Sequence, residues 1–295
     1  MSGPSAEFRA HAGSGLTTLC RAWAVSRADG VVFGFTDHDC PLAFEGVTFE
    51  PGSGLTARAL QQATGLSVDN SEALGVLSAA AVREEDIDAG RFDNADVRCW
   101  LVNWQDVSQR WLQFRGTIGE IRRAGGAFEA ELRGLTEALN RPLGRIYQKP
   151  CTAVLGDAGC RFDLETPGYA VELAAEVAEG SERFQWDALA GFEPGWFAGG
   201  RLSVLSGAAE GLWSMVKTDR SDASGRSLAL WQPVRAPVAP GDLLRLDAGC
   251  DKRMETCRLK FNNLLNFQGF PDIPGEDWVM AVPHQSGRNS GGSRR

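Results

Sequence analysis

The sequence predicts a mainly β protein of the α+β type, built from two domains. Short runs of alternating apolar and polar residues recur along the chain, and Gly, Pro, Asn or Asp residues separate them. A length of 295 residues exceeds what a single hydrophobic core usually holds. Hydrophobic residues form 43% and charged residues 23% of the chain, which is ordinary for a globular protein.

The first domain is expected at residues 1–146, as an antiparallel β barrel or sandwich. Its early strands are TTLCRAWAVSR, VVFGFTDHD and FEGVTFEP, and Asp29-Gly30 between the first two predicts a hairpin with a primed turn. A second tight turn is expected at Phe44-Glu45-Gly46-Val47, and SGLTARALQQ is expected to begin a further strand. The acidic residues of VREEDIDAG, followed by a glycine, predict a short helix.

Two later segments, DVRCWLVNW and QRWLQFRGTIGEIRRAGGAFEAELRGL, predict long strands of the same domain. In FEAELRGL, Phe128, Ala130 and Leu132 share one face, and this period of two is typical of a half-buried strand. Gly125-Gly126 is expected to form the turn before it.

The second domain is predicted at residues 147–283, and prolines at 142 and 150 favour a boundary in this region. It contains a small β barrel at about 169–249, inserted between two pairs of cysteines. The strand-like runs of the insert are GYAVELAAEV, GRLSVLSG, LWSMVKTDR, RSLALWQPV and GDLLRLDAG. Residues 284–295 are small, polar and basic, and predict a disordered tail.

Charge and hydropathy exclude some classes of function. A net charge of −8 argues against general wrapping of nucleic acid, which requires Lys and Arg to neutralise several phosphates. No apolar run approaches the roughly 20 residues that span a bilayer, so no membrane anchor is expected. The first residues do not form a secretory signal, which predicts synthesis in the cytosol.

The four cysteines of the second domain are candidate metal ligands: Cys151, Cys160, Cys250 and Cys257. The ends of a closed barrel meet, so an insert brings its two flanking pairs together, and a four-sulfur site indicates Zn²⁺ or an iron–sulfur cluster. Eight residues separate the first pair and six the second. These spacings exceed those of zinc fingers and fit a cluster better. Four unrelated buried thiols are the alternative.

The other candidate residues are expected to be structural. Cys20, Cys40 and Cys99 lie in strand-like runs and are expected in the core. His38 between Asp37 and Asp39 is the group most similar to an enzyme site, since a histidine beside carboxylates can act as a base. A phosphate loop, a nucleophile elbow and a zinc-protease motif are all missing from the sequence, so no catalysis is expected.

Longer phrases carry a resemblance to a known family. GFTDHDCPLAFEGVTF, LVNWQDVSQR, GTIGEIRR, LRGLTEALNRPLGRIYQKPC and GCDKRMETCRLKFNNLLNFQGFPDIPG resemble the DUF2163 or BR0599 family of phage tail proteins, which includes tail hubs of gene transfer agents. The resemblance extends from about Leu16 to Pro274. The C-terminal half is also similar to the tail tip protein L of phage lambda, in which four cysteines of the same paired spacing precede a Gly-Phe-Pro segment.

The resemblance implies a [4Fe-4S] cluster on the four cysteines, with zinc as the alternative. The stretch between the pairs is longer here than in the lambda-type protein, so this assignment requires the insert to fold as a self-contained module. Asparagines are expected to hydrogen-bond the sulfurs or cap the backbone, and phenylalanines to exclude water. These residues are Asn262, Asn263, Asn266, Phe261, Phe267 and Phe270.

The same resemblance implies a structural hub at the tail tip or baseplate of a virion-like particle. The expected assembly is a homotrimer around the tail axis, bound to the distal tail protein ring and to a host-facing tip or fibre protein of the lambda J type. DNA would pass through its channel without sequence-specific binding, which the negative net charge favours. A soluble iron–sulfur or zinc protein with a redox role is the alternative function.

Overall fold

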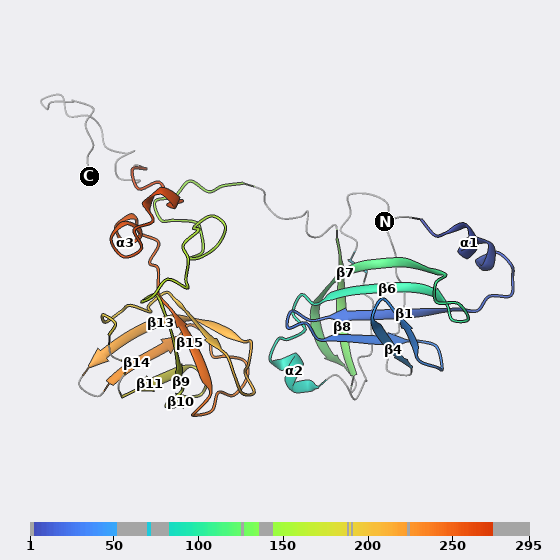
Figure 1. The fold of residues 1–295 in the computed structure, drawn as a ribbon, viewed down its shortest axis with the longest axis horizontal. Helices are drawn as coiled ribbons and strands as arrows, with labels where there is room; N and C mark the ends of the chain where they lie inside the picture. Colours follow the sequence, from blue (N-terminus) through green and yellow to red (C-terminus); the bar gives the residue numbers. More distant parts are fainter. Residues whose placement is uncertain are drawn as a thin grey trace, which may run out of the picture. The chain divides into compact units, whose positions relative to one another are not determined.

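A computed structural model describes residues 3–51, 70–71, 83–124, 127–135, 144–187, 189, 191–222 and 225–273 (Figure 1). The chain divides into two compact units, residues 1–142 and 143–295, just before the boundary expected at residue 146. Each unit contains one β sheet, and the mainly β fold is confirmed. The strand expected to begin at 53–62, the turn at Gly125-Gly126 and the tail at 284–295 lie outside the described residues.

The first unit contains one eight-stranded sheet, with strand order β3-β4-β2-β1-β6-β7-β8-β5. Its pairs are antiparallel except for β2 with β4. The elements in chain order are α1 (Ala6–Ala12), β1 (Leu19–Ser26), β2 (Val32–Thr36), β3 (Leu42–Phe44), β4 (Val47–Pro51), β5 (Asn70–Ser71), α2 (Glu84–Asp88), β6 (Asp96–Asn103), β7 (Arg110–Ala124) and β8 (Ala127–Gly134). The helix expected in VREEDIDAG is α2.

The hairpin at Asp29-Gly30 is confirmed, but the expectation that its turn is of a primed type is wrong. The loop has three residues: the N–H of Gly30 donates to the carbonyl of Arg27, and the N–H of Arg27 donates to that of Val31. Within this loop Gly30 alone has a positive φ, 87°. The carboxylate of Asp29 accepts the N–H of Val31 and pairs with the Arg27 guanidinium. These two contacts hold Asp29 in the turn without a positive φ.

A primed turn occurs instead between β3 and β4. Phe44 pairs directly with Val47, so the loop has two residues, Glu45 and Gly46, and their φ values are 51° and 74°. Two successive positive φ values define the type I′ turn, whose twist matches that of the paired strands. The tight turn expected here is therefore confirmed.

Strand β1 is buried on both faces. Alternate side chains enter two hydrophobic clusters, as the strand period of two requires. The first cluster contains Trp23, Val25, Phe35, Phe92, Val97, Cys99, Phe114, Ile118, Ala130 and Leu132. The second contains Cys20, Ala22, Leu42, Phe44, Phe49, Trp100 and Val102. The expected common face of Ala130 and Leu132 is confirmed, whereas nothing is described for the side chain of Phe128.

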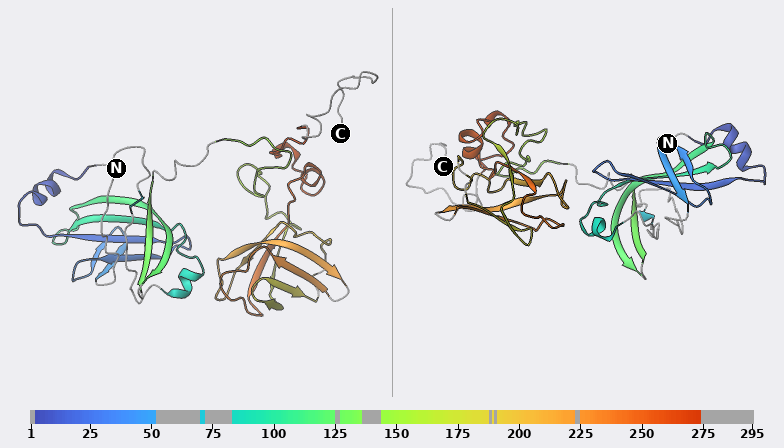
Figure 2. Two further views of the ribbon diagram at one scale, coloured as in Figure 1. Left: turned by 180° about the vertical axis from the view of Figure 1, so that it is seen from behind. Right: turned by 60° about the horizontal axis from the view of Figure 1, so that its bottom comes forward.

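Strand β7 bends, so the sheet is not flat. Cys99 pairs with Phe114 but the next residue, Trp100, pairs with Leu112, which leaves one extra residue in β7. A second extra residue lies between Ile118 and Ile121, where β7 pairs with β8. Such a bulge bends and twists its strand. Figures 1 and 2 show the result, since β8 and the adjoining part of β7 run steeply across the direction of β1.

Two of the three cysteines expected in this core are there. Cys20 is 7% exposed and Cys99 is fully buried, but Cys40 is exposed, so the expectation for Cys40 is wrong. Strand β2 ends at Thr36, and Cys40 lies in the bend that follows. The alternation that would have turned its side chain inward therefore stops before it.

The second unit contains a seven-stranded antiparallel sheet, with strand order β10-β11-β14-β13-β12-β15-β9. Its strands are β9 (Ala170–Ala174), β10 (Val177–Glu179), β11 (Arg183–Trp186), β12 (Arg201–Val204), β13 (Trp213–Asp222), β14 (Gly225–Leu230) and β15 (Leu243–Asp247). The helix α3 (Met254–Leu259) and the 3₁₀ helix η2 (Leu264–Asn266) follow. We call the sheet of β9–β15 the insert barrel.

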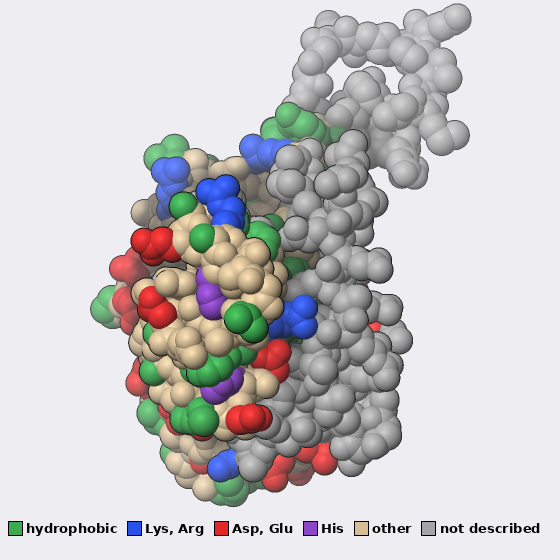
Figure 3. All heavy atoms as spheres, turned by 90° about the vertical axis from the view of Figure 1, so that its right-hand side faces the viewer, with side chains coloured by type: hydrophobic (Ala, Val, Ile, Leu, Met, Phe, Trp, Pro, Cys, Tyr) green, Lys and Arg blue, Asp and Glu red, His purple; other side chains and the backbone are tan. Residues whose placement is uncertain are grey.

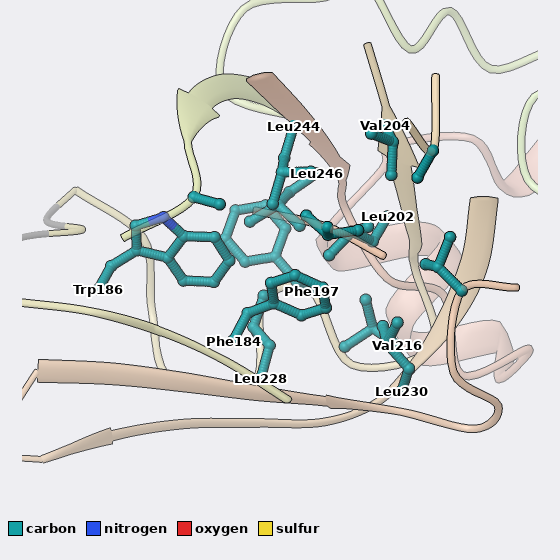
Figure 4. Close-up of a cluster of buried hydrophobic side chains, with 14 residues drawn as sticks. Phe184, Trp186, Phe197, Leu202, Val204, Val216, Leu228, Leu230, Leu244 and Leu246 are labelled. Atoms are coloured by element: carbon teal, nitrogen blue, oxygen red, sulfur yellow. The ribbon is translucent and has the colours of Figure 1, made fainter. Parts of the chain in front are cut away.

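The insert barrel curls around one hydrophobic core. Its edge strands β9 and β10 are separated in the chain by only Ala175 and Glu176, and the indole N–H of Trp186 in β11 donates to the carbonyl of Ala174 at 2.8 Å. Figure 4 shows the core side chains, and those it labels come from strands β11 to β15 and from the loop before β12. They include Phe184, Trp186, Phe197, Leu202, Val204, Val216, Leu228, Leu230, Leu244 and Leu246.

A buried ion pair crosses from β13 to β14 in this barrel. The Arg226 guanidinium donates to both carboxylate oxygens of Asp219, at 2.8 and 2.6 Å, and also to the carbonyls of Phe192 and Glu193. Asp219 accepts the N–H of Phe197 at 2.9 Å. The pair therefore fixes the loop of residues 192–197 against the barrel with every charge hydrogen-bonded.

One face of the chain carries side chains of both charge signs, although the net charge of the whole chain is −8. On the described part of the face shown in Figure 3, acidic and basic side chains both occur between polar ones. Among the described helices, none is long and apolar enough to cross a membrane.

We predict that Arg226→Met lowers the free energy of unfolding by about 3–5 kcal/mol, because it leaves the buried Asp219 carboxylate without its partner. Urea denaturation measures this. Arg98→Met is the matched control, since Arg98 pairs with Asp96 at 3.0 Å but its side chain is 41% exposed, and its loss is expected within about 1 kcal/mol. Equal losses in the two variants would contradict the prediction.

Candidate metal centre

The structure brings all four candidate cysteines of the second unit to one small cavity. Cys151 and Cys160 lie in the loop before the insert barrel, Cys250 follows β15, and Cys257 lies in α3. Their side chains line the cavity together with Leu155, Phe261, Phe267, Asn263, Asn266 and Lys252. Cys160 and Cys257 are buried, and Cys151 and Cys250 are half-buried.

The four cysteines line the same cavity. In the part of the chain that the structure describes, no three His, Cys, Asp or Glu side chains form a group that would hold a single ion. One tetrahedral ion with sulfur bonds of about 2.3 Å draws its ligands to a point, whereas the separate irons of a cluster are reached from around it. Four thiols around one cavity are a donor set that both zinc and iron–sulfur clusters use.

Polar groups contact the sulfurs. The backbone N–H of Gln268 donates to Sγ of Cys151 at 3.4 Å, and the Asn263 amide donates to Sγ of Cys160 at 3.5 Å. Sγ of Cys257 donates to the carbonyl of Asn263 at 3.3 Å. Donors beside sulfur orient ligands and stabilise thiolates. The segment after α3 therefore contacts three of the four cysteines.

Hydrogen bonds from backbone and side-chain donors also join the two cysteine-bearing segments. The N–H of Cys151 donates to the carbonyl of Lys252 at 2.8 Å, and the Lys252 ammonium donates to the carbonyl of Ala153 at 2.6 Å. The Asn263 amide donates to the carbonyl of Cys160 at 2.7 Å. Residues near Cys250 and Cys257 thus hold the segment that carries Cys151 and Cys160.

Asp157 shapes the loop between the first two cysteines. Its carboxylate accepts the N–H groups of Cys160, Val154 and Gly159 at 2.6, 2.8 and 2.8 Å. These hydrogen bonds, that of Cys160 above all, lower the pKa of Asp157, because they favour its charged form. The carboxylate therefore fixes the backbone on which Cys160 lies.

Burial makes two of the thiols, those of Cys250 and Cys257, weaker acids. It raises the pKa of Cys257 to about 11, and it also raises the pKa of Cys250. The neighbouring cysteines add to both shifts, because a second negative charge nearby disfavours ionisation. A metal that bound here would displace the thiol protons, since thiolate is the ligand form.

The expected supporting residues are partly confirmed. Asn263 contacts sulfur and is itself held by the Asn266 amide at 2.7 Å, and Phe261 and Phe267 line the cavity. Asn262 is instead an exposed turn residue with φ 47°. Phe270 does not line the cavity but packs on Tyr147, with ring centroids 4.7 Å apart.

Sequence reasoning missed Asp157, Lys252 and Gln268. For Asp157 a signal was present, because an Asp three residues before Cys160 in a glycine-containing loop is typical of a side chain that accepts nearby backbone N–H groups. No comparable signal marked Lys252 or Gln268, which act through backbone atoms or a flexible side chain.

The His38 group has structural partners. The Asp37 carboxylate accepts the backbone N–H of Arg21 at 2.6 Å, and Nδ1 of His38 accepts that of Cys40 at 3.0 Å. The His38 ring packs on Trp104, with centroids 4.9 Å apart. These contacts close the bend after β2, as expected of residues with a structural role.

We predict that Asp157→Ala accelerates hydrogen exchange at the amides of Val154, Gly159 and Cys160, because each loses its acceptor. Exchange measured by NMR or mass spectrometry tests this. Asp163→Ala is the control, since that exposed carboxylate accepts the N–H of Glu165 and should affect exchange there. Unchanged protection at the three amides would show that Asp157 does not hold the loop.

Comparison with known families covers both halves of the chain. Residues 5–163 match the family described as baseplate hub protein, N-terminal attachment domain. Residues 195–277 match the family described as phage conserved hypothetical protein BR0599. The first match includes Cys151 and Cys160, and the second includes Cys250 and Cys257.

A solved structure matches nearly the entire chain. It is a chain of the structure titled "Virion of native gene transfer agent (GTA) particle", with 55% sequence identity and a TM-score of 0.91, over 98% of this chain and 99% of that chain. No curated protein matched. The expected resemblance to phage tail proteins is confirmed, and the chain belongs to the phage baseplate hub protein family.

Proposed function

We propose that this protein is a structural hub of a phage-like tail, in a particle of the gene transfer agent type. The observation that carries this is the match of almost the entire chain to a chain of a gene transfer agent virion, together with the baseplate hub attachment domain at residues 5–163. The protein acts in the tail or baseplate of the particle. We assign it no catalytic activity, and the comparisons give no support to a soluble redox protein.

The detailed assembly is a homotrimer around the tail axis. In this proposal the first unit binds the distal tail protein ring, since its family is described as an attachment domain. The second unit supports a host-facing tip or fibre protein. DNA passes through the channel without sequence-specific binding, and a net charge of −8 supports this, because a channel rich in Lys and Arg would retain phosphate by many contacts.

The second unit is held together by a [4Fe-4S] cluster bound to Cys151, Cys160, Cys250 and Cys257. Support comes from the four thiols around one cavity, the donors to sulfur and the apolar side chains that limit water there. When bound, the cluster supplies metal–thiolate bonds that form only in the folded chain. Comparable structural zinc sites contribute on the order of 10 kcal/mol to folding. Its role here is structural, and zinc is the alternative metal.

We predict that Cys160→Ser or Cys250→Ser removes the bound iron and the visible absorption of anaerobically purified protein and lowers its thermal stability, because the ligand set is broken. Iron analysis and thermal unfolding measure this. Cys40→Ser changes an exposed thiol in the other unit and should retain the iron. Equal iron content in all these variants would exclude the four-cysteine site.

The hub role itself is tested in cells that make the particles. Without this chain, we predict heads and tails that lack a tip, because the distal tail ring has nothing to bind. Electron microscopy and mass spectrometry of purified particles measure this. Particles with complete tips in its absence would contradict the hub role, whatever metal the chain binds.

A further inference from the structure

Lys260 occupies the junction between the insert barrel and the cysteine-bearing segments. Its ammonium donates to the carbonyls of Trp196 and Gly249, at 2.6 and 2.9 Å, and lies 4.1 Å from the centroid of the Trp196 ring. Its own carbonyl accepts the hydroxyl of Tyr169 at 2.6 Å. One residue just after α3 therefore contacts the entry to β9, the loop before β12 and the exit from β15.

We propose that Lys260 is a positioning residue that supplies a fixed positive charge beside the four-thiol site and couples the filling of that site to the position of the insert barrel. The inference rests on the proposed metal site. It does not depend on the metal, because four thiolates around either one zinc ion or an oxidised [4Fe-4S] core leave the site doubly negative.

The contacts of Lys260 favour a charged ammonium, whereas its burial lowers its pKa. Two carbonyl oxygens and the face of an indole ring all attract a cation. Among the described residues, no carboxylate lies within ion-pair distance of its Nζ. A partly buried lysine without an acidic partner is costly unless another negative charge offsets it. The carbonyl it contacts belongs to Gly249, the residue directly before Cys250.

The backbone at this junction is tightly packed. The N–H of Gly249 donates to the carbonyl of Trp196 at 2.8 Å, the same oxygen that Lys260 contacts. A Cβ at position 249 would lie 1.8 Å from the carbonyl oxygen of Ala198, so glycine is required there. A shift of the loop before β12 would therefore move the backbone that carries Cys250.

Lys252 has a different role. Its side chain also lines the four-thiol cavity, but its ammonium donates to Ala153, within the cysteine-bearing segments. Lys260 lies in the cysteine-bearing segment after α3, and its ammonium contacts both the loop before β12 and the end of β15 in the insert barrel. This dual contact is what assigns the coupling to Lys260.

The test compares three variants of anaerobically purified full-length protein. Lys260→Gln removes the charge and retains an amide donor, whereas Lys260→Arg retains the charge. Lys217→Gln is the matched control, because the Lys217 ammonium also lies over an indole ring, 5.1 Å from that of Trp231, but on the outer face of the barrel. The readouts are the rate of metal loss to a chelator, the reduction potential of bound iron and hydrogen exchange at Gly249.

We predict that Lys260→Gln loses metal about 10- to 100-fold faster, as expected for a residue that supports metal ligands. Its reduction potential should become more negative, because a nearby positive charge is gone, and the Gly249 amide should exchange faster. Lys260→Arg should keep the reduction potential of the unchanged protein. Lys217→Gln should match the unchanged protein in all three readouts.

Two results would overturn the inference separately. If Lys260→Gln retains metal and potential while Gly249 exchanges faster, Lys260 is a packing residue without influence on the site. If Lys260→Arg shifts the potential as far as Lys260→Gln does, charge is not the cause. Metal-free unchanged protein would instead overturn the metal site itself, and this inference with it.

Discussion

The pairing of β9 with β15 is the constraint on which the second unit depends. Ala170 at the start of β9 pairs with Asp247 at the end of β15, and the N–H of Ala248 donates to the carbonyl of Tyr169 at 2.7 Å. The chain therefore enters and leaves the insert barrel at adjacent points. Two cysteine pairs that are distant in sequence are brought together by this one antiparallel pair of strands.

The insert barrel depends in turn on the four-thiol site. Bonds between the thiols and a shared metal group would close the long loop that contains the barrel, and closing a loop removes conformational freedom from the unfolded chain. The barrel core and the four-thiol site thus stabilise the same closed arrangement. The Asn263 amide, the Lys252 carbonyl and the Lys260 ammonium complete that closure with hydrogen bonds across the segments.

Much of the fold could be predicted because its strands alternate clearly. Strand β1 and the long strands β6 and β7 lie where the period of two places them, and the insert between the cysteine pairs begins and ends close to the expected residues 169 and 249. The short strands β10, Val177–Glu179, and β11, Arg183–Trp186, were missed. The helix α1 was missed because its segment has one buried residue, Phe8, and no repeating apolar face.

The errors have local physical causes. Asp29 is bound by Arg27 and Val31, so the Asp-Gly signal produced a three-residue loop, and the primed turn formed at Glu45-Gly46. Cys40 lies beyond the end of its strand. At the site, sequence reasoning selected the four thiols that line the cavity, because cysteine is a metal-binding residue type and these four occur as two pairs that flank the insert. It missed Lys252 and Lys260, whose roles depend on which backbone carbonyl the fold places beside them.

The central claim is that Cys151, Cys160, Cys250 and Cys257 share one metal cluster. X-ray absorption at the iron and zinc edges of the anaerobically purified chain tests it most directly, since each spectrum reports which atoms surround that metal. A shared cluster predicts iron with sulfur neighbours and, beyond them, further iron. Nitrogen or oxygen neighbours from the protein in place of sulfur, or zinc without a second metal nearby, would contradict it.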